Sequence, residues 1–398
     1  MAFLFCTGFE HGSTNTTPLG SGITDPFFAA ASNITIDGTT FRTGNYALKV
    51  APTASADSYG DRFLTVSIVN TAHRGYMRFS TLPTGEAEVW REIHSIAGDQ
   101  PNLSVDGTNN RWVLKVASGS VNSSGVTPQT GVWHRIEIHV FYNSGAARWE
   151  IDWYIDGVAQ SQLVAAGTTA AATRVRWGTT STAGPAYTGF VDDWVVFQSA
   201  QPVSEWPPGD GVVRGLSPTG MGTHVNEADF QDDGGGAIDS NDYTRVDDVP
   251  MTSTTDFIEQ ITVGSTSYIE LTFADWPDST NQVIDGAWGW VTAHGSAAGA
   301  NNGWDVNALY DATEVIIISA GSTDVGGTAI SSGGATIGVT SVSEVDSLKM
   351  RFGYAPDVVP IPRFDAFMIE VSGRVGGGAD HWAWAEGSDD MDSWQVVG

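Results

Sequence analysis

Hydrophobic and polar residues alternate along much of the chain, and this period of two predicts strands rather than helices. In residues 132–140, valine and isoleucine fall on one face and charged side chains on the other. Residues 149–155 repeat the pattern, with Trp149 and Trp153 opposite the carboxylates. Such alternation is typical of half-buried antiparallel strands. Asp156-Gly157 follows directly and predicts a tight hairpin turn.

Further strands are predicted in both halves of the chain, separated by loops rich in Gly, Ser, Thr and Asn. They are 47–51, 63–69, 75–80, 111–117, 190–197, 256–263, 267–273, 287–293, 314–319, 347–354 and 363–371. We find no long segment with a 3.6-residue period. The fold class is therefore predicted to be all-β.

Residues 201–211 contain three prolines and two glycines, which interrupt both helices and sheet ladders. We therefore predict two antiparallel β-sandwich (jelly-roll) domains in tandem, residues 1–200 and 212–371, joined by the linker 201–211. A short acidic tail that contains tryptophan, residues 372–398, follows them. The length of 398 residues fits two or three domains at about 150 residues each.

Acidic residues outnumber basic ones, 46 to 18, for a net charge of −28. Residues 1–206 carry a net −5 and residues 207–398 a net −23. This balance argues against nucleic acid and against an anionic membrane surface as partners. No apolar stretch reaches the ~18–20 residues that span a bilayer.

The N-terminal residues show neither a basic region nor a long apolar run, so we expect no secretory signal. Cys6 is the single cysteine, which excludes an internal disulfide and a cysteine-based zinc site. Its place in the opening apolar strand predicts a small core residue.

Four motifs follow one another in the first half: Gly44–Val50, Trp133–Ile138, Trp153–Val158 and Val191–Phe197. Together they resemble the concanavalin A-like, or laminin G-like, jelly-roll family over roughly residues 1–200. The resemblance implies two antiparallel sheets that face each other.

Segments of the second half look like parts of bacteriophage virion proteins. They are 211–214, 220–224, 243–250, 348–354 and 360–366. Tandem laminin G-like modules are also similar to head and tail accessory proteins of such phages. This resemblance implies a place in the virion, after synthesis in the host cytoplasm.

Glu150 and Asp152 lie where related glycosidases carry a motif of paired acids on one strand. The second glutamate is missing, because Tyr154 and Ile155 occupy its positions and Asp156 belongs to the turn. We also find no catalytic motif around a nucleophile or a metal-binding histidine pair. The chain is therefore predicted not to be an enzyme.

An acidic loop surrounds the glycines at 234–236, and carboxylate oxygens are ligands that Ca²⁺ prefers. A calcium site and an acidic surface that faces a partner are both open interpretations; no other cofactor is indicated. The carboxylates are Asp229, Asp232, Asp233, Asp239 and Asp242.

A second group has the composition of a sugar-binding platform, in which aromatic rings stack on sugars beside amide side chains. The same tryptophans could instead form the core face of a strand. The residues are Trp288, Trp290, Trp304, Asn301 and Asn302.

The tail carries Trp382, Trp384 and Trp394, which predict either a flexible segment or an arm that docks on a neighbouring subunit. Our leading hypothesis is a non-enzymatic phage structural protein, decorating the head or associated with the tail or fibre. Its expected partners are copies of itself, with a trimer among the arrangements considered, other virion proteins and a host-surface glycan. The alternatives are a lectin-like glycan-binding module and, third, a glycoside hydrolase.

Overall fold

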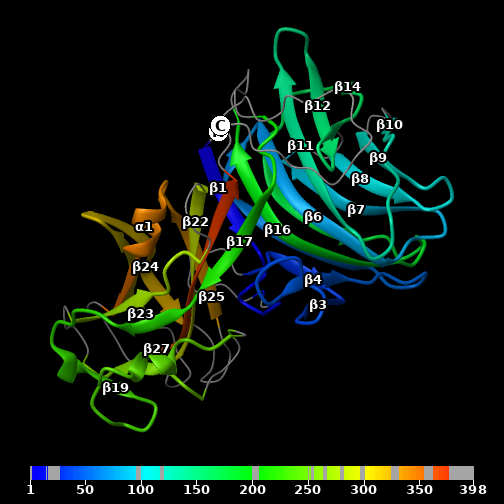
Figure 1. The fold of residues 1–398 in the computed structure, drawn as a ribbon. Helices are drawn as coiled ribbons and strands as arrows, with labels where there is room; N and C mark the ends of the chain where they lie inside the picture. The colour runs from blue at the N-terminus through cyan, green and yellow to red at the C-terminus, as the bar shows by residue number, and fades with distance from the viewer. Residues whose placement is uncertain are drawn as a thin grey trace, which may run out of the picture.

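The computed structural model describes residues 2–14, 16, 27–95, 100–116, 121–199, 206–249, 251, 255–262, 267–277, 282–295, 301–323, 331–353 and 362–375. Within these ranges the chain is almost entirely β, and its strands form four sheets in two bodies (Figure 1). Every pair of named strands is antiparallel. The predicted all-β class and sandwich architecture are confirmed.

A nine-stranded and a seven-stranded sheet build the first body. The nine-stranded sheet has the order β13 (Val158–Ala159), β12 (Arg148–Ile155), β11 (Trp133–Asn143), β6 (Thr71–Thr81), β16 (Thr188–Gln198), β4 (Ala47–Val50), β3 (Ile34–Asp37), with β1 (Ala2–Thr7) beside β16 and β14 (Leu163–Ala166) beside β12. The seven-stranded sheet has the order β10 (Val121–Ser123), β9 (Arg111–Val116), β8 (Pro101–Asp106), β7 (Glu86–His94), β15 (Ala172–Thr179), β5 (Ser58–Ile68), β2 (Ala30–Ser32).

A six-stranded and a five-stranded sheet build the second body. The six-stranded sheet has the order β19 (Phe230–Asp232), β20 (Ile258–Gln260), β27 (Pro362–Val375), β22 (Gln282–Gly295), β25 (Ser331–Ile337), with β17 (Gly211–Leu216) beside β27. The five-stranded sheet has the order β18 (Pro218–Met221), β21 (Tyr268–Phe273), β26 (Lys349–Gly353), β23 (Asn301–Tyr310), β24 (Thr313–Thr323).

Among the described residues, helix is confined to three short segments, α1 (Val342–Asp346), η1 (Glu227–Asp229) and η2 (Asp242–Arg245). In the ranges listed above, no helix has the length and hydropathy needed to cross a bilayer.

The alternation in residues 149–155 produces the predicted burial. Trp149, Ile151, Trp153 and Ile155 all face the interior of the first sandwich. Asp156 and Gly157 have φ values of 54° and 79° and join β12 to β13 as the predicted two-residue turn.

Strand β7 was not predicted, because a bulge interrupts its alternation. The pairing with β8 shifts between Glu88 and Trp90, so Val89 and Trp90 are both buried although they are adjacent. A period-two search reads such a segment as irregular.

The hydrophobic core of the first sandwich includes side chains from the second body, so the two bodies meet through more than a linker. Strand β22 directs Trp288 and Trp290 into the core of the first sandwich, while Ala287 and Val291 belong to the core of the second. Side chains of strand β27 also enter both cores, and Met368 belongs to the core of the first sandwich. The outer face of the six-stranded sheet therefore packs on the first sandwich.

Strand β1 lies at this junction and contacts both bodies (Figure 1). It pairs with β16, and its Phe5 ring meets Trp288 edge to face at 6.3 Å. The buried Arg62 guanidinium lies 4.8 Å from the ring of Trp288 and 4.7 Å from that of Trp290. These contacts combine aromatic packing with cation–π attraction inside the core.

A buried carboxylate, Glu370 of β27, binds the N-terminal segment to the second body. Its Oε1 accepts hydrogen bonds from the backbone N–H groups of Gly8 and Glu10, each at 3.0 Å. Its Oε2 accepts one from Trp290 Nε1 at 2.7 Å. Since a buried carboxylate is costly without such donors, this network specifies how the bodies dock.

We predict that Trp290→Ala uncouples the two bodies. It removes a fully buried ring and one donor to Glu370, at a cost of about 3–5 kcal/mol. Calorimetry should then resolve two unfolding transitions where the native chain shows one. The matched control is Trp112→Ala, buried within the first sandwich, which should lower stability but keep one transition. A single transition for both variants would contradict the prediction.

The junction should also lose stability as pH rises. Burial raises the pKa of Glu10 to about 9 and that of Glu370 to about 7, from a usual value of 4.5. The folded state therefore holds these protons at pH values where the unfolded chain has released them. Stability from this source is complete below about pH 4.5 and falls as pH rises toward 9.

Denaturant unfolding of the native chain and Glu10→Gln at about pH 5 and pH 9 tests this coupling. The glutamine cannot ionise but keeps an oxygen that can accept from the N–H of Asn45. We expect the native chain to lose more stability between the two pH values than the variant does. Equal losses would refute a role for the Glu10 proton.

Candidate functional site

A polar hollow of about 210 Å³ opens on the first sandwich, where β7 begins and β15 ends. Strands β7 and β15 are antiparallel neighbours, so the start of one lies beside the end of the other. The lining residues are Glu86, Ala87, Glu88, Arg91, Thr179, Thr180, Ser181, Gly184 and Pro185.

The charged groups of this hollow are paired with one another or with neighbours. Arg91 Nε lies 3.1 Å from both carboxylate oxygens of Glu88, and Lys115 contacts Glu86. Desolvation by burial raises the pKa of Glu88, an effect that Arg91 opposes. The site therefore offers fixed hydrogen-bonding groups with compensated charge.

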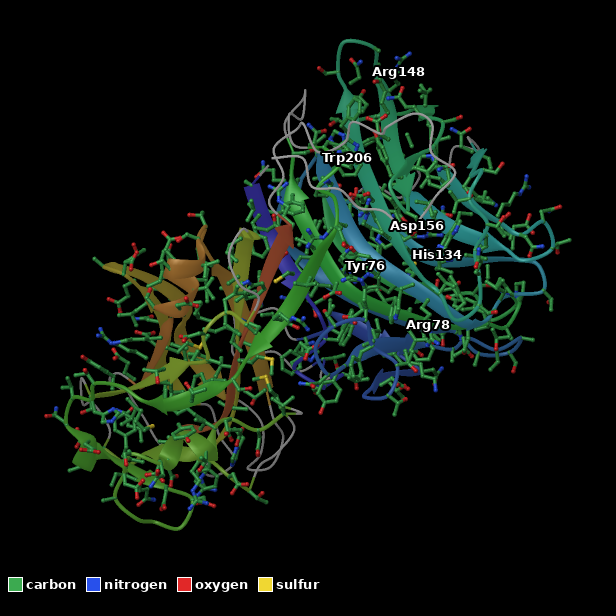
Figure 2. The ribbon with its side chains drawn as sticks, in the orientation of Figure 1. Tyr76, Arg78, His134, Arg148, Asp156 and Trp206 are labelled. Atoms are coloured by element: carbon green, nitrogen blue, oxygen red, sulfur yellow. The ribbon has the colours of Figure 1, made fainter. Side chains whose placement is uncertain are left out.

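The segment after Trp206 covers part of the outer face of the nine-stranded sheet (Figure 2). The Trp206 ring lies 5.3 Å from that of His139 and 5.9 Å from that of Tyr154. Gly209 donates its N–H to the buried Glu137 at 2.7 Å, and Asp210 contacts the Tyr76 hydroxyl. This part of the predicted linker is thus packed against the sheet.

Two histidines and a glutamate form a cluster inside the first sandwich that the sequence analysis did not identify. The carboxylate of Glu92 lies 2.6 Å from Nε2 of His73 and 2.6 Å from Nε2 of His94. All three side chains are sealed from solvent. Hydrogen bonds from His73 and His94 lower the pKa of Glu92 against the opposing effect of burial. The cluster satisfies a buried charge in the core.

The acids considered for glycoside hydrolysis have structural partners. Glu150 accepts from Arg148 Nε at 2.7 Å, and Asp152 accepts from Gln162 at 2.8 Å. Asp156 accepts from the Nδ1 of His134 at 2.7 Å, since the Nε2 of that ring accepts from the N–H of Gln129.

The carboxylates of the predicted calcium loop surround an arginine. Arg245 lies 3.0 Å from Asp233, 3.7 Å from Asp232 and 3.9 Å from Asp242. Asp239 and Asp229 lie apart from this contact: Asp239 accepts from the N–H of Asn241, and Asp229 contacts Ser267. Across the described ranges, no three His, Cys, Asp or Glu side chains are placed to hold a metal.

The structure excludes two residues of the predicted sugar-binding platform. Trp288 and Trp290 share a face, as their spacing predicts, but they are 0% and 1% exposed because the first sandwich covers that face. Trp304, Asn301 and Asn302 belong to β23, and their side chains lie outside the described residues. So do Trp382, Trp384 and Trp394 of the tail.

Comparison with known proteins finds no matching family model and no matching curated protein. A sialidase structure is 14% identical with a TM-score of 0.32, covering 47% of this chain and 19% of the sialidase. An alginate lyase of polysaccharide lyase family 7 is 10% identical, with a TM-score of 0.32 and coverage of 43% and 86%. The receptor-binding domain of botulinum neurotoxin type G is 11% identical, with a TM-score of 0.35 and coverage of 71% and 77%.

The chain thus spans about a fifth of the length of the sialidase that it matches. At TM-scores of 0.32 to 0.35 these likenesses establish neither a family nor an activity for this chain. The β-sandwich architecture is consistent with the concanavalin A-like fold that the motifs of the first half predict.

We predict that Arg245 occupies the place that a cation would take in the acidic loop. Calcium should therefore leave the melting temperature of the native chain unchanged. Arg245→Ala leaves Asp232, Asp233 and Asp242 without their shared cation, so their mutual repulsion should lower the melting temperature of this variant. Added Ca²⁺ should recover part of that loss by screening the repulsion rather than by filling a preformed site. Arg148→Ala, an exposed arginine of the first sandwich, is the control. Stabilisation of the native chain by calcium would contradict this prediction and favour the calcium site.

Proposed function

We propose that the chain is a non-enzymatic structural protein of a bacteriophage particle, placed in the head decoration or the tail and fibre region. The observation that carries this proposal is the core shared by the two sandwiches. This core holds the two sandwiches in one arrangement, which suits a structural part of a larger particle. The bacteriophage particle is proposed because segments of the second half resemble virion proteins in sequence.

Exposed apolar residues on edge strands support assembly with further copies. Strand β24 ends the five-stranded sheet, and its Ile316 is 59% exposed. Strand β10 ends the seven-stranded sheet, and its Val121 is 53% exposed. Apolar edge strands pair readily with other chains. We therefore expect a homo-oligomer.

Glycan binding is the second candidate function, and the polar hollow beside β7 favours it. A virion protein can also adhere to the host surface, so the two functions are compatible. The buried tryptophans of β22 cannot contact a glycan, because the first sandwich covers them.

Light scattering coupled to size-exclusion chromatography tests the assembly. We expect an oligomer for the native chain and a shift toward monomer for Ile316→Lys, whose charge would be buried in an edge-to-edge contact. Thr313→Lys, at an exposed position of the same strand, is the matched control and should remain oligomeric. Mass spectrometry of washed particles tests the location. A native monomer that is missing from such particles would overturn the proposal.

A further inference from the structure

The hollow on the first sandwich is built by two segments about ninety residues apart in the sequence. One is the beginning of β7, from Glu86 to Arg91, and the other is residues 179–185, at the end of β15 and beyond it. The pairing of Trp177 with Trp90 brings them together. Because both segments continue into buried strands, the walls are held by the core.

Charge in the walls is balanced before any ligand arrives. Arg91 holds Glu88 through both of its carboxylate oxygens, and Lys115 holds Glu86. Behind them, Arg176 pairs with Asp61 at 2.6 Å and reaches Thr180 Oγ1 at 3.4 Å. A charged ligand would have to compete with these pairs, whereas a neutral ligand would leave them intact.

The walls combine acceptors, donors and a small apolar area. Glu86 and Glu88 present carboxylate oxygens, and Thr180 and Ser181 present hydroxyls that both donate and accept. Pro185 supplies apolar surface, whereas Ala87 lies at the wall but is buried in the core. A ligand with several hydroxyl groups and a C–H face matches this lining.

We propose that this hollow binds one neutral hexose unit at the end of a glycan. The volume of about 210 Å³ lies below the ~300–1,000 Å³ typical of pockets for drug-sized ligands, so it suits a single ring. Carboxylates beside an arginine can bind adjacent hydroxyls of one ring, as fixed polar groups do in small-molecule sites. The inference names a ligand for the second candidate function and does not depend on location in a particle.

Ligand-observed NMR with D-glucose, D-galactose and D-mannose tests the site, with D-glucuronate and D-glucosamine as charged counterparts. We expect at least one neutral hexose to bind with a dissociation constant in the millimolar range, about −4 kcal/mol. The charged sugars should bind at least tenfold more weakly. Absence of binding by all three hexoses, or equal binding of a charged sugar, would overturn the proposal.

A matched pair of glycine variants places the binding in the hollow. A Cβ at Gly184 would meet Ser181 Oγ at 3.6 Å, an ordinary contact, so this position accepts a side chain and Gly184→Val should narrow the hollow. Gly125 has no atom within 4 Å of its Cβ position and lies outside the lining, so Gly125→Val is the control. With melting temperatures unchanged, the first variant should lose binding at least tenfold and the second should bind as the native chain.

Unchanged hexose binding by Gly184→Val would show that any sugar binds elsewhere and would refute this site. The outcome is separate from the test of the structural role. If the chain is found in washed particles as an oligomer but binds none of the hexoses, the proposed structural function stands and only this inference is refuted.

Discussion

The carboxylate of Glu370 is the group on which the arrangement of the two sandwiches depends. It is fully buried and accepts from the N–H groups of Gly8 and Glu10 and from the indole of Trp290. A carboxyl group in such a place, whether protonated or ionised, is tolerated only while its hydrogen-bond partners are present. The residues after β1 and the rings of β22 must therefore meet at one point, and this requirement excludes a free hinge between the bodies.

The uneven distribution of charge along the chain favours ion pairs between its two halves at the junction. The first half has a small net charge, and two of its arginines pair with carboxylates of the acidic second half. Arg74 pairs with Asp285 at 3.2 Å, and Arg42 pairs with Asp210 at 2.8 Å as well as with Asp193 of its own half. These pairs lower the repulsion that the excess of carboxylates creates.

The candidate site illustrates why residue types alone were a poor guide to it. The sequence analysis selected Trp288 and Trp290 because sugar sites use aromatic rings, and their shared parity is real. Whether that face is exposed to solvent depends on what packs against it. The first sandwich packs against it, so the two rings are buried. The hollow beside β7 is instead lined by Glu88 and Ser181, which the pairing of β7 with β15 brings together. No local pattern in the sequence predicts that pairing.

The sequence by itself determined the fold class, the hairpin at Asp156-Gly157 and the inward face of β12, because these depend on a period of two and on local turn geometry. The bulged strand β7, the His73–Glu92–His94 cluster and the shared core were decided only by tertiary structure. Each of them joins residues that are far apart or breaks the alternation on which strand prediction relies. Burial is a property of two surfaces in contact, and a single strand specifies only one of them.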